Sequence, residues 1–581
     1  MRAPHAVLSL ALLTACAGAG SGGGGASAPR AIDAPNGRSA PAGGAAASSE
    51  SHATNVAAEV LAAGGNAIDA AVALHFALAV TYPYAGNLGG GGFLVYHAAD
   101  GGDWFLDFRE TAPAAAGPDF YRGADGSVDA EASRLGWKAV GVPGAVPGMW
   151  EAHRRWGSLP WRDLVLPAAR LAEQGFRLTP GECARLERAR EDLARDARAS
   201  AVFLVDGAVP EPGSLLRQPA LAETLQRIAA EGEAPLRDGP LVEALVAASD
   251  AGGGALTAAD FRDYRPVLRP LHRIAWRGLE VLAPGAPSSG GVFLGQMLPV
   301  LEERPLAEWG FDDPRTVQFL GEASAAAFRD RNAWLGDPAG FDFDVRGLLD
   351  PGYLAARAAA LSEHRYTAPD VSLPAPPVEH GETTHFSVMD GAGGAVSCTT
   401  TLNGLYGAKV MAPAGFLMNN EMDDFAAAPG EPNQFGLVQG KYNAVRAGRR
   451  PLSSMAPILV LRDGQVDAVI GSPGGPTILS SVLQVLLNRY LFDMQPRAAV
   501  AAPRLHRQDL PSDLQFEPRR LDATTRVALE GLGQPLRERT PIGDVNAVFR
   551  TPRGLHAVAD PRHEGLGVVV GLVAAQGPVR R

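Results

Sequence analysis

The most constraining feature of this sequence is the stretch Gly-Glu-Thr-Thr-His-Phe-Ser-Val at residues 381–388. A proline-rich segment, residues 369–378, precedes it, and two extended runs follow on either side of an Asp-Gly-Ala-Gly-Gly turn at residues 390–394. Aspartate and glycine supply the positive φ angles that a tight reversal needs. The pattern therefore predicts a β-hairpin whose first strand begins at Thr383.

A threonine at the start of a strand has two interpretations. Its hydroxyl is a poor nucleophile until a base removes the proton. If the Glu382–Thr383 bond were cut, Thr383 would carry an α-amine with a pKa of about 8, which could act as that base near neutral pH. The alternative is an ordinary strand residue, because β-branched side chains favour strands. The motif by itself leaves both interpretations open.

Motifs along the rest of the chain resemble those of the γ-glutamyltransferase family. Segments similar to the family's small subunit are Thr-Thr-His-Phe-Ser-Val at 383–388, Thr-Leu-Asn at 401–403, Asn-Asn-Glu-Met-Asp-Asp-Phe at 419–425, Arg-Pro-Leu-Ser-Ser-Met at 450–455 and Gly-Ser-Pro-Gly-Gly at 471–475. Segments similar to the large subunit are Gly-Gly-Asn-Ala-Ile-Asp-Ala-Ala at 64–71, the glycine-rich 86–93, Asp-Phe-Arg-Glu at 107–110, Gly-Val-Pro-Gly at 141–144 and Pro-Ser-Ser-Gly-Gly at 287–291. They follow the family's order, and the resemblance extends over residues 51–570.

The resemblance implies a fold that periodicity alone does not specify. Hydrophobic patterning indicates only a mixed α and β protein, with helices expected over residues 53–63 and 66–80 and a buried strand over 93–96. The family's fold is an α+β, four-layer αββα sandwich of the N-terminal-nucleophile type. By the resemblance, the precursor cuts itself before Thr383. The products would be a large subunit, residues 51–382, and a small subunit, residues 383–581, which form one intertwined fold.

The resemblance also implies a catalytic group around Thr383. Thr401 would hydrogen-bond the nucleophile and assist cleavage. Thr401 and Asn403 are two residues apart, and an extended strand would place them on the same side. The backbone N–H groups of Gly474 and Gly475 would form the oxyanion hole, where donors must reach within about 3 Å of the developing charge.

Other motif residues are expected to bind the substrate. Arg109, Ser453 and Ser454 would hold the α-carboxylate of a γ-glutamyl group, which suits the planar fork of a guanidinium. Asn403, Glu421 and Asp424 would hold its α-amine, since neighbouring carboxylates attract a cation. Residues 432–449 match a loop that covers the pocket in many members, with Phe435 as the closing aromatic residue. Without the resemblance, the acidic group would be interpreted as a surface turn.

The N-terminus predicts export. Arg2 precedes a short apolar stretch, residues 6–13, and Leu-Thr-Ala-Cys at 13–16 resembles a bacterial lipoprotein box. Residues 1–15 would be a signal peptide, Cys16 the lipidated residue, and residues 16–50 a flexible tether rich in Gly, Ala, Ser and Pro. The protein is then expected in the periplasm of a Gram-negative-type bacterium, held at the membrane only by the lipid. The alternative is a plain signal peptide cut nearby.

Composition argues against several other classes of protein function. The net charge is −11 and no basic run is present, so nucleic acid is not an expected partner. The 12 histidines form no metal-ligand motif, and neither a metal nor a cofactor is expected. If Cys16 is lipidated, Cys183 and Cys398 remain, and the sequence leaves open whether they pair.

The sequence thus predicts an exported, self-processing γ-glutamyltransferase or glutathione hydrolase. It would transfer the γ-glutamyl group of glutathione and related compounds to water or to amino acid and dipeptide acceptors, through a γ-glutamyl-threonine intermediate. One alternative is an acylase or amidase of the same superfamily, acting on non-glutamyl side chains or on poly-γ-glutamate. Another is an inactive exported scaffold.

Overall fold

The computed structural model describes residues 40–123, 125, 127–129, 131–340, 344–369, 383–426 and 429–571. The chain divides into two units, Met1–Ala34 and Pro35–Arg581, and the first lies outside the described residues. The predictions for the signal peptide, for Cys16, for the first part of the tether and for Glu382 also fall outside them. Across the described ranges, no helix has both the length and the apolar character that crossing a bilayer requires.

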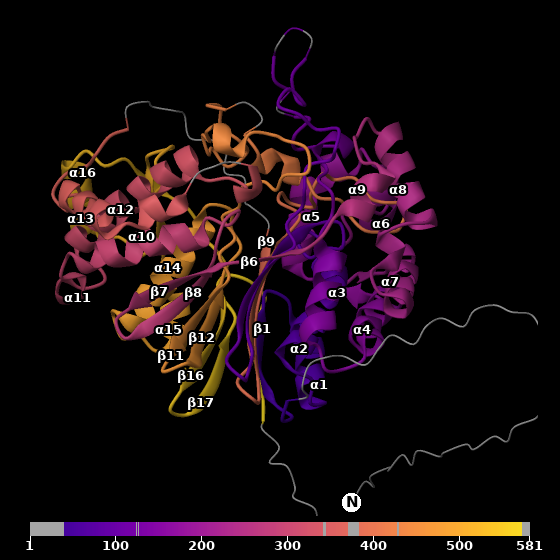
Figure 1. Ribbon diagram of the computed structural model, residues 1–581, viewed down its shortest axis with the longest axis horizontal. Helices are drawn as coiled ribbons and strands as arrows, with labels where there is room; N and C mark the ends of the chain where they lie inside the picture. Colours follow the sequence, from indigo (N-terminus) through magenta and orange to yellow (C-terminus); the bar gives the residue numbers. More distant parts are fainter. Residues whose placement is uncertain are drawn as a thin grey trace, which may run out of the picture. The chain divides into compact units, whose positions relative to one another are not determined.

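Two mainly antiparallel sheets form the centre of the described fold (Figure 1). The first has the order β18 (Leu566–Val570), β1 (Gly44–Ser48), β9 (Thr383–Asp390), β10 (Ala395–Thr401), β2 (Gly91–His97), β3 (Asp103–Asp107) and β6 (Val267–Arg269). The second has the order β17 (Gly554–Val558), β16 (Asn546–Thr551), β12 (Gln465–Gly471), β11 (Ile458–Arg462), β8 (Leu279–Pro284) and β7 (Leu271–Trp276). Two small sheets lie outside them: β4 (Phe176–Arg177) with β5 (Leu215–Leu216), and β13 (Leu505–His506), β14 (Leu514–Phe516) and β15 (Leu536–Glu538).

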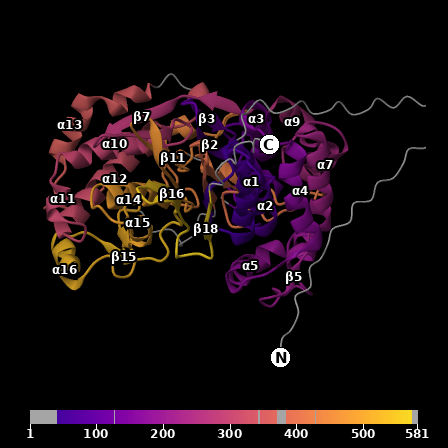
Figure 2. The same ribbon diagram turned by 90° about the horizontal axis from the view of Figure 1, so that it is seen from below.

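Helices cover the outer face of each sheet (Figures 1 and 2). On the side of the first sheet are α1 (Ser51–Ala62), α2 (Ala67–Thr81), α3 (Ala145–Trp156), α4 (Trp161–Gln174), α5 (Pro180–Leu193), α6 (Ala197–Phe203), α7 (Pro219–Glu231), α8 (Pro240–Ala251) and α9 (Ala258–Asp263). On the side of the second are α10 (Gly290–Glu302), α11 (Leu306–Trp309), α12 (Pro314–Trp334), α13 (Pro351–Ala360), α14 (Thr477–Tyr490), α15 (Pro496–Ala501) and α16 (Ala523–Gly531). The helices expected over 53–63 and 66–80 and the strand over 93–96 are confirmed as α1, α2 and β2.

The two sheets pack face to face, which makes four layers. Ser387 Oγ on β9 donates to the carbonyl oxygen of Asn546 on β16 at 2.9 Å, and Ser397 Oγ on β10 donates to that of Ile470 on β12 at 3.1 Å. Small hydroxyl side chains therefore bridge the sheets, because their polar atoms find backbone acceptors on the opposite sheet. The αββα architecture of the sequence prediction is confirmed.

The prediction of a tether over residues 16–50 is wrong at its C-terminal end. Residues 44–48 form β1, which pairs antiparallel with β9 on one side and with β18 on the other. Ala45 and Ala47 face the core between the sheets and Ala46 faces the helical core, and all three are fully buried. Alanine suits a strand that is covered on both faces, since a larger side chain would separate the layers. The folded domain thus begins before residue 51.

The glycine-rich segment 86–92 packs closely against a neighbouring strand. A Cβ atom on Gly90 would lie 2.1 Å from the carbonyl oxygen of Thr401 at the end of β10. The backbone of this segment therefore contacts the strand that returns from Thr383. Cys183 on α5 and Cys398 on β10 are both free thiols, and both are buried.

Candidate active site

Thr383 lies at the mouth of the central hairpin. It is the first residue of β9, and the predicted hairpin is confirmed by the register that pairs Thr383 with Thr401 and Met389 with Ala395. The hydroxyl of Thr383 donates to Thr401 Oγ at 3.2 Å, and both side chains are buried. The expected contact between these two hydroxyls is therefore present.

Asn403 also lies beside Thr383 and Thr401, but it is not on the strand where it was predicted. β10 ends at Thr401, and Asn403 follows it with a φ of 74°, so the two residues do not share a strand face. The backbone N–H of Asn403 donates to Thr401 Oγ at 2.7 Å, and its side chain donates to the carbonyl oxygen of Asn420 at 3.0 Å. A left-handed asparagine turns the chain back toward Thr383, which alternation along a strand could not predict.

A pocket on one side of Thr383, here called the inner pocket, is lined by all six residues predicted to bind the substrate. It also takes in Arg331, which the sequence analysis missed. The lining residues are Arg109, Arg331, Thr383, Thr401, Asn403, Glu421, Asp424, Phe435, Leu437, Ser453, Ser454, Met455, Gly475, Pro476 and Ile478.

Arg109 is the residue around which the acidic side chains of the inner pocket gather. It follows β3, is fully buried, and forms ion pairs with Glu421 and Asp424 of the short 3-10 helix Glu421–Asp424. The neighbouring Glu110 lies 3.7 Å from the same guanidinium. The groups expected to hold opposite ends of a substrate therefore bind each other.

The pKa values of this cluster follow from burial and from its uneven charge. Burial raises the pKa of Glu421 and of Asp424, and Arg109 opposes that rise. Burial likewise raises the pKa of Glu110 to about 7. Burial alone would lower the pKa of Arg109, but the three carboxyl groups raise it above the usual arginine value. The guanidinium of Arg109 thus faces three acids, which favours a retained proton near neutral pH.

Ser453 and Ser454 lie beside this cluster, and Ser454 is held by Arg331. Arg331 on α12 donates to Ser454 Oγ at 3.1 Å and to Ser289 Oγ at 3.2 Å. Burial lowers its pKa to about 10, so the guanidinium remains charged at neutral pH. The inner pocket therefore has a second buried cation. Arg331 lies within an alanine-rich helix, and nothing in that sequence indicates that its side chain reaches the inner pocket.

Asp423 points away from the inner pocket, unlike the two acids around it. It accepts hydrogen bonds from Ser133 Oγ at 2.6 Å and from the backbone N–H of Gln434 at 3.1 Å. The second contact anchors the loop that carries Phe435, and the Phe435 ring lies 3.3 Å from where a Cβ on Gly475 would be. Asp423 thus positions the covering loop of the pocket.

Gly474 and Gly475 lie just before α14, with φ angles of 129° and 57°. These positive angles favour glycine. Neither backbone N–H donates to another residue of the described chain, and both lie near the positive end of the α14 dipole. Two uncommitted donors beside Thr383 can stabilise a developing anion.

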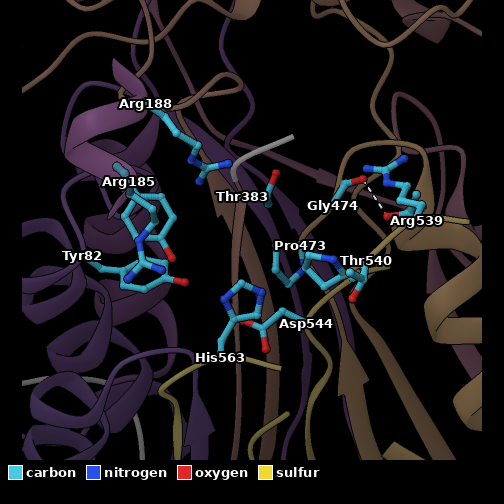
Figure 3. A pocket seen from close by; sticks show the side chains of 14 residues that line it. Tyr82, Arg185, Arg188, Thr383, Pro473, Gly474, Arg539, Thr540, Asp544 and His563 are labelled. Carbon is cyan, nitrogen blue, oxygen red and sulfur yellow. Dashed lines mark hydrogen bonds between the residues drawn. The ribbon is translucent and has the colours of Figure 1, made fainter. Parts of the chain in front are cut away.

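A second pocket, here called the outer pocket, opens on the other side of Thr383 (Figure 3). Its lining residues are Tyr82, Tyr84, Arg185, Arg188, Thr383, Pro473, Gly474, Thr477, Arg539, Thr540, Pro541, Gly543, Asp544 and His563. It holds about 650 Å³ of space, against about 320 Å³ for the inner pocket. No sequence pattern predicted this pocket, because most of its walls come from segments outside the motifs quoted above.

His385 lies two residues after Thr383 on β9. His385 is fully buried between Thr399 Oγ and Ser387 Oγ, and burial lowers its pKa to about 3. It is therefore a neutral core residue. Within the ranges that the structure describes, no group of three or more His, Cys, Asp or Glu side chains is arranged to hold a metal ion.

Four αββα layers, with a threonine at the mouth of a central strand, define an N-terminal-nucleophile hydrolase. A cephalosporin acylase from Bacillus halodurans has the same fold, with a TM-score of 0.78 at 24% identity over 94% of this chain and 99% of that one. The family model for γ-glutamyltranspeptidase matches residues 53–570, and the chain belongs to that family.

Curated relatives agree with this assignment. A glutathione hydrolase proenzyme from Pseudomonas sp. (strain A14) is 42% identical over 86% of this chain and 87% of its own length. The acylase ACY 1 proenzyme of Pseudomonas sp. (strain V22) is 35% identical over 88% of this chain and 91% of its own. The protein is therefore an enzyme whose relatives include both glutathione hydrolases and an acylase.

Proposed function

We propose that the protein is a self-processing γ-glutamyltransferase and glutathione hydrolase. It transfers the γ-glutamyl group of glutathione and related compounds to water or to amino acid and dipeptide acceptors. The observation that carries this proposal is the buried group of Arg109, Glu421 and Asp424 in the pocket that Thr383 lines. One cation and two acids are complementary to the carboxylate and ammonium of an α-amino acid head group.

Substrate binding exchanges ion pairs within the protein for ion pairs with the head group. The α-carboxylate takes the guanidinium of Arg109 and the hydroxyls of Ser453 and Ser454. The α-ammonium takes Asn403 together with the acids Glu421 and Asp424. Buried charges stay paired throughout, which limits the desolvation cost. A substrate that lacks either charge would leave one side of the group unpaired.

Processing before Thr383 supplies the base for catalysis. Cleavage of the Glu382–Thr383 bond gives Thr383 an α-amine, while the hydroxyl of Thr401, 3.2 Å away, orients the nucleophile. The products are a chain that ends at Glu382 and a chain from Thr383 to Arg581, which together form a heterodimer. The name "proenzyme" of the Pseudomonas relative supports such a step.

Transfer then proceeds through a covalent ester. Thr383 Oγ attacks the γ-carbonyl carbon while its α-amine takes the hydroxyl proton. The N–H groups of Gly474 and Gly475 stabilise the tetrahedral oxyanion. The intermediate expels the leaving amine, which receives the proton from the α-ammonium. Water or an acceptor amine attacks the γ-glutamyl ester, and Thr383 is regenerated.

The acylase relative makes acylase activity a second candidate function. An acylase acting on other side chains would not need a site for an α-amino acid head group, whereas Arg109 and Asp424 form one here. Phe435 covers the pocket at Gly475, which favours small γ-glutamyl compounds over poly-γ-glutamate. The third possibility, an inactive scaffold, is disfavoured by the retained Thr383, Thr401 and glycine pair.

Export and anchoring complete the proposal. The signal-like residues 1–15 and the lipoprotein box at Cys16 support a periplasmic, lipid-anchored enzyme. Because β1 begins at Gly44, the tether between lipid and domain would end before that residue.

The first experiment is N-terminal sequencing of every polypeptide in the purified protein, beside Thr383→Ala. We expect two chains in the wild type, one of which starts at Thr383, and a single uncut chain without activity in the variant. Thr384→Ala is the matched control, because its side chain is buried next to Thr383 but does not line either pocket. A single chain in both wild type and Thr383→Ala would overturn the proposal.

A further inference from the structure

The outer pocket carries an excess of positive charge. Its basic and acidic lining residues are Arg185, Arg188, Arg539, Asp544 and His563. The carboxyl group of Asp544 is buried, its pKa is raised by that burial, and it accepts a hydrogen bond from Ser49 Oγ at 2.6 Å. Three guanidinium groups and one buried carboxyl group thus line the outer pocket. A pocket with this balance favours an anionic ligand.

Arg185 is held in a defined place by aromatic rings. Its guanidinium lies 4.3 Å from the centre of the Tyr84 ring and 5.7 Å from that of Tyr82, distances typical of cation–π contacts. Its Nε atom is buried and lacks a hydrogen-bond partner in the described structure. The rest of the guanidinium group is only partly buried and lines the outer pocket, where it can bind an anion.

Glu182 on the same helix attracts Arg185 electrostatically, but its carboxylate also has another partner. Glu182 lies one turn before Arg185, but its carboxylate accepts the backbone N–H of Thr179 at 2.6 Å in the capping box of α5. Arg188 lies one turn after Arg185 and extends from α5 toward Thr383 (Figure 3). Two arginines three residues apart share one face of a helix. That face borders Thr383 on the side opposite the inner pocket.

We propose that Arg185, assisted by Arg188, binds the terminal carboxylate of the peptide that leaves from the donor and of a dipeptide that acts as acceptor. This inference rests on the proposed γ-glutamyl transfer, because it places the glutamyl head group in the inner pocket. The remainder of the substrate then extends from Thr383 into the outer pocket.

The test compares two donors that differ only at the far end. Glutathione ends in a glycine carboxylate, and its C-terminal amide has the same length without the charge. In the wild type, kcat/KM for glutathione should exceed that for the amide by about tenfold or more, as expected for hydrogen bonds to a charged group. Arg185→Met should remove this preference by lowering the glutathione value alone. Arg185→Lys should restore part of it.

The same comparison applies to acceptors, with glycylglycine against glycylglycinamide at a fixed donor concentration. Arg190→Met is the matched control, since Arg190 lies on α5 but pairs with Glu187 at 2.9 Å. We expect Arg190→Met to keep the preference for the carboxylate. Equal rates for acid and amide in the wild type, or an equal loss for both in Arg185→Met, would overturn the inference. Absence of turnover of either donor by the processed wild type would instead overturn the proposed function.

Discussion

The two pockets that meet at Thr383 differ in how they hold charge. In the inner pocket, Arg109 is fully buried and already paired with Glu421 and Asp424. In the outer pocket, Arg185 rests against aromatic rings, and its Nε has no acceptor within the described chain. The first arrangement demands a ligand that replaces both partners at once, so it is selective. The second demands only an anion, so it tolerates different peptides.

We expect the largest effect from a substitution in the inner pocket. Asp424→Asn removes one partner of a buried ion pair, a change that costs about 2–5 kcal/mol. We expect kcat/KM for a γ-glutamyl anilide to fall about a hundredfold, mainly through KM. The preference for glutathione over its C-terminal amide, which belongs to the outer pocket, should persist.

Asp423→Asn is the control for this change. Asp423 is adjacent in sequence and buried, but it contacts Ser133 and Gln434 and does not line the pocket. Its effect on KM should be much smaller. Equal losses in the two variants would show that the acidic segment acts through folding and not through the substrate ammonium.

A smaller effect is expected from pH. Burial raises the pKa of Asp424 and Glu421, and that of Glu110 to about 7. Lowering the pH from 8 to 6 therefore protonates Glu110, which removes one negative charge from the cluster proposed to bind the substrate ammonium, and KM for the donor should rise about fivefold. Arg185 keeps its charge in this range, so the ratio of glutathione to amide rates should change less than the donor KM. Steady-state kinetics across this range measure both, and a constant donor KM would contradict the assignment.

The smallest effect is expected at the cover of the inner pocket. Phe435→Ala removes the ring that lies against Gly475. We expect donor KM to rise about threefold, the loss of a modest apolar contact, and longer γ-glutamyl chains to gain access. Hydrolysis of poly-γ-glutamate oligomers beside glutathione measures both. Phe435→Tyr should behave as the wild type. If Phe435→Ala hydrolyses the oligomers no faster than the wild type, the covering loop does not determine substrate length.

The sequence predicted the centre of this site well because its residues lie in continuous motifs. Thr383 at a strand start, the turn at 390–394 and the glycines before α14 each have a local chemical signature. Arg331 has none, since its role arises only where α12 packs beside Ser454. The strand β1 was missed because Gly-Ala-Ala-Ala-Ser has the composition of a linker. Its small side chains reflect burial between two layers, which composition cannot distinguish from flexibility.

The position of β1 has a consequence for the protein after cleavage. Across the first sheet, strands from before and after residue 383 alternate: β18, then β1, then β9 and β10, then β2. The second sheet adds another junction between β11 and β8. A cut chain would therefore dissociate only by losing its whole hydrogen-bonded framework. Its melting temperature would depend on protein concentration, as for any obligate two-chain assembly, while that of the uncut form would not.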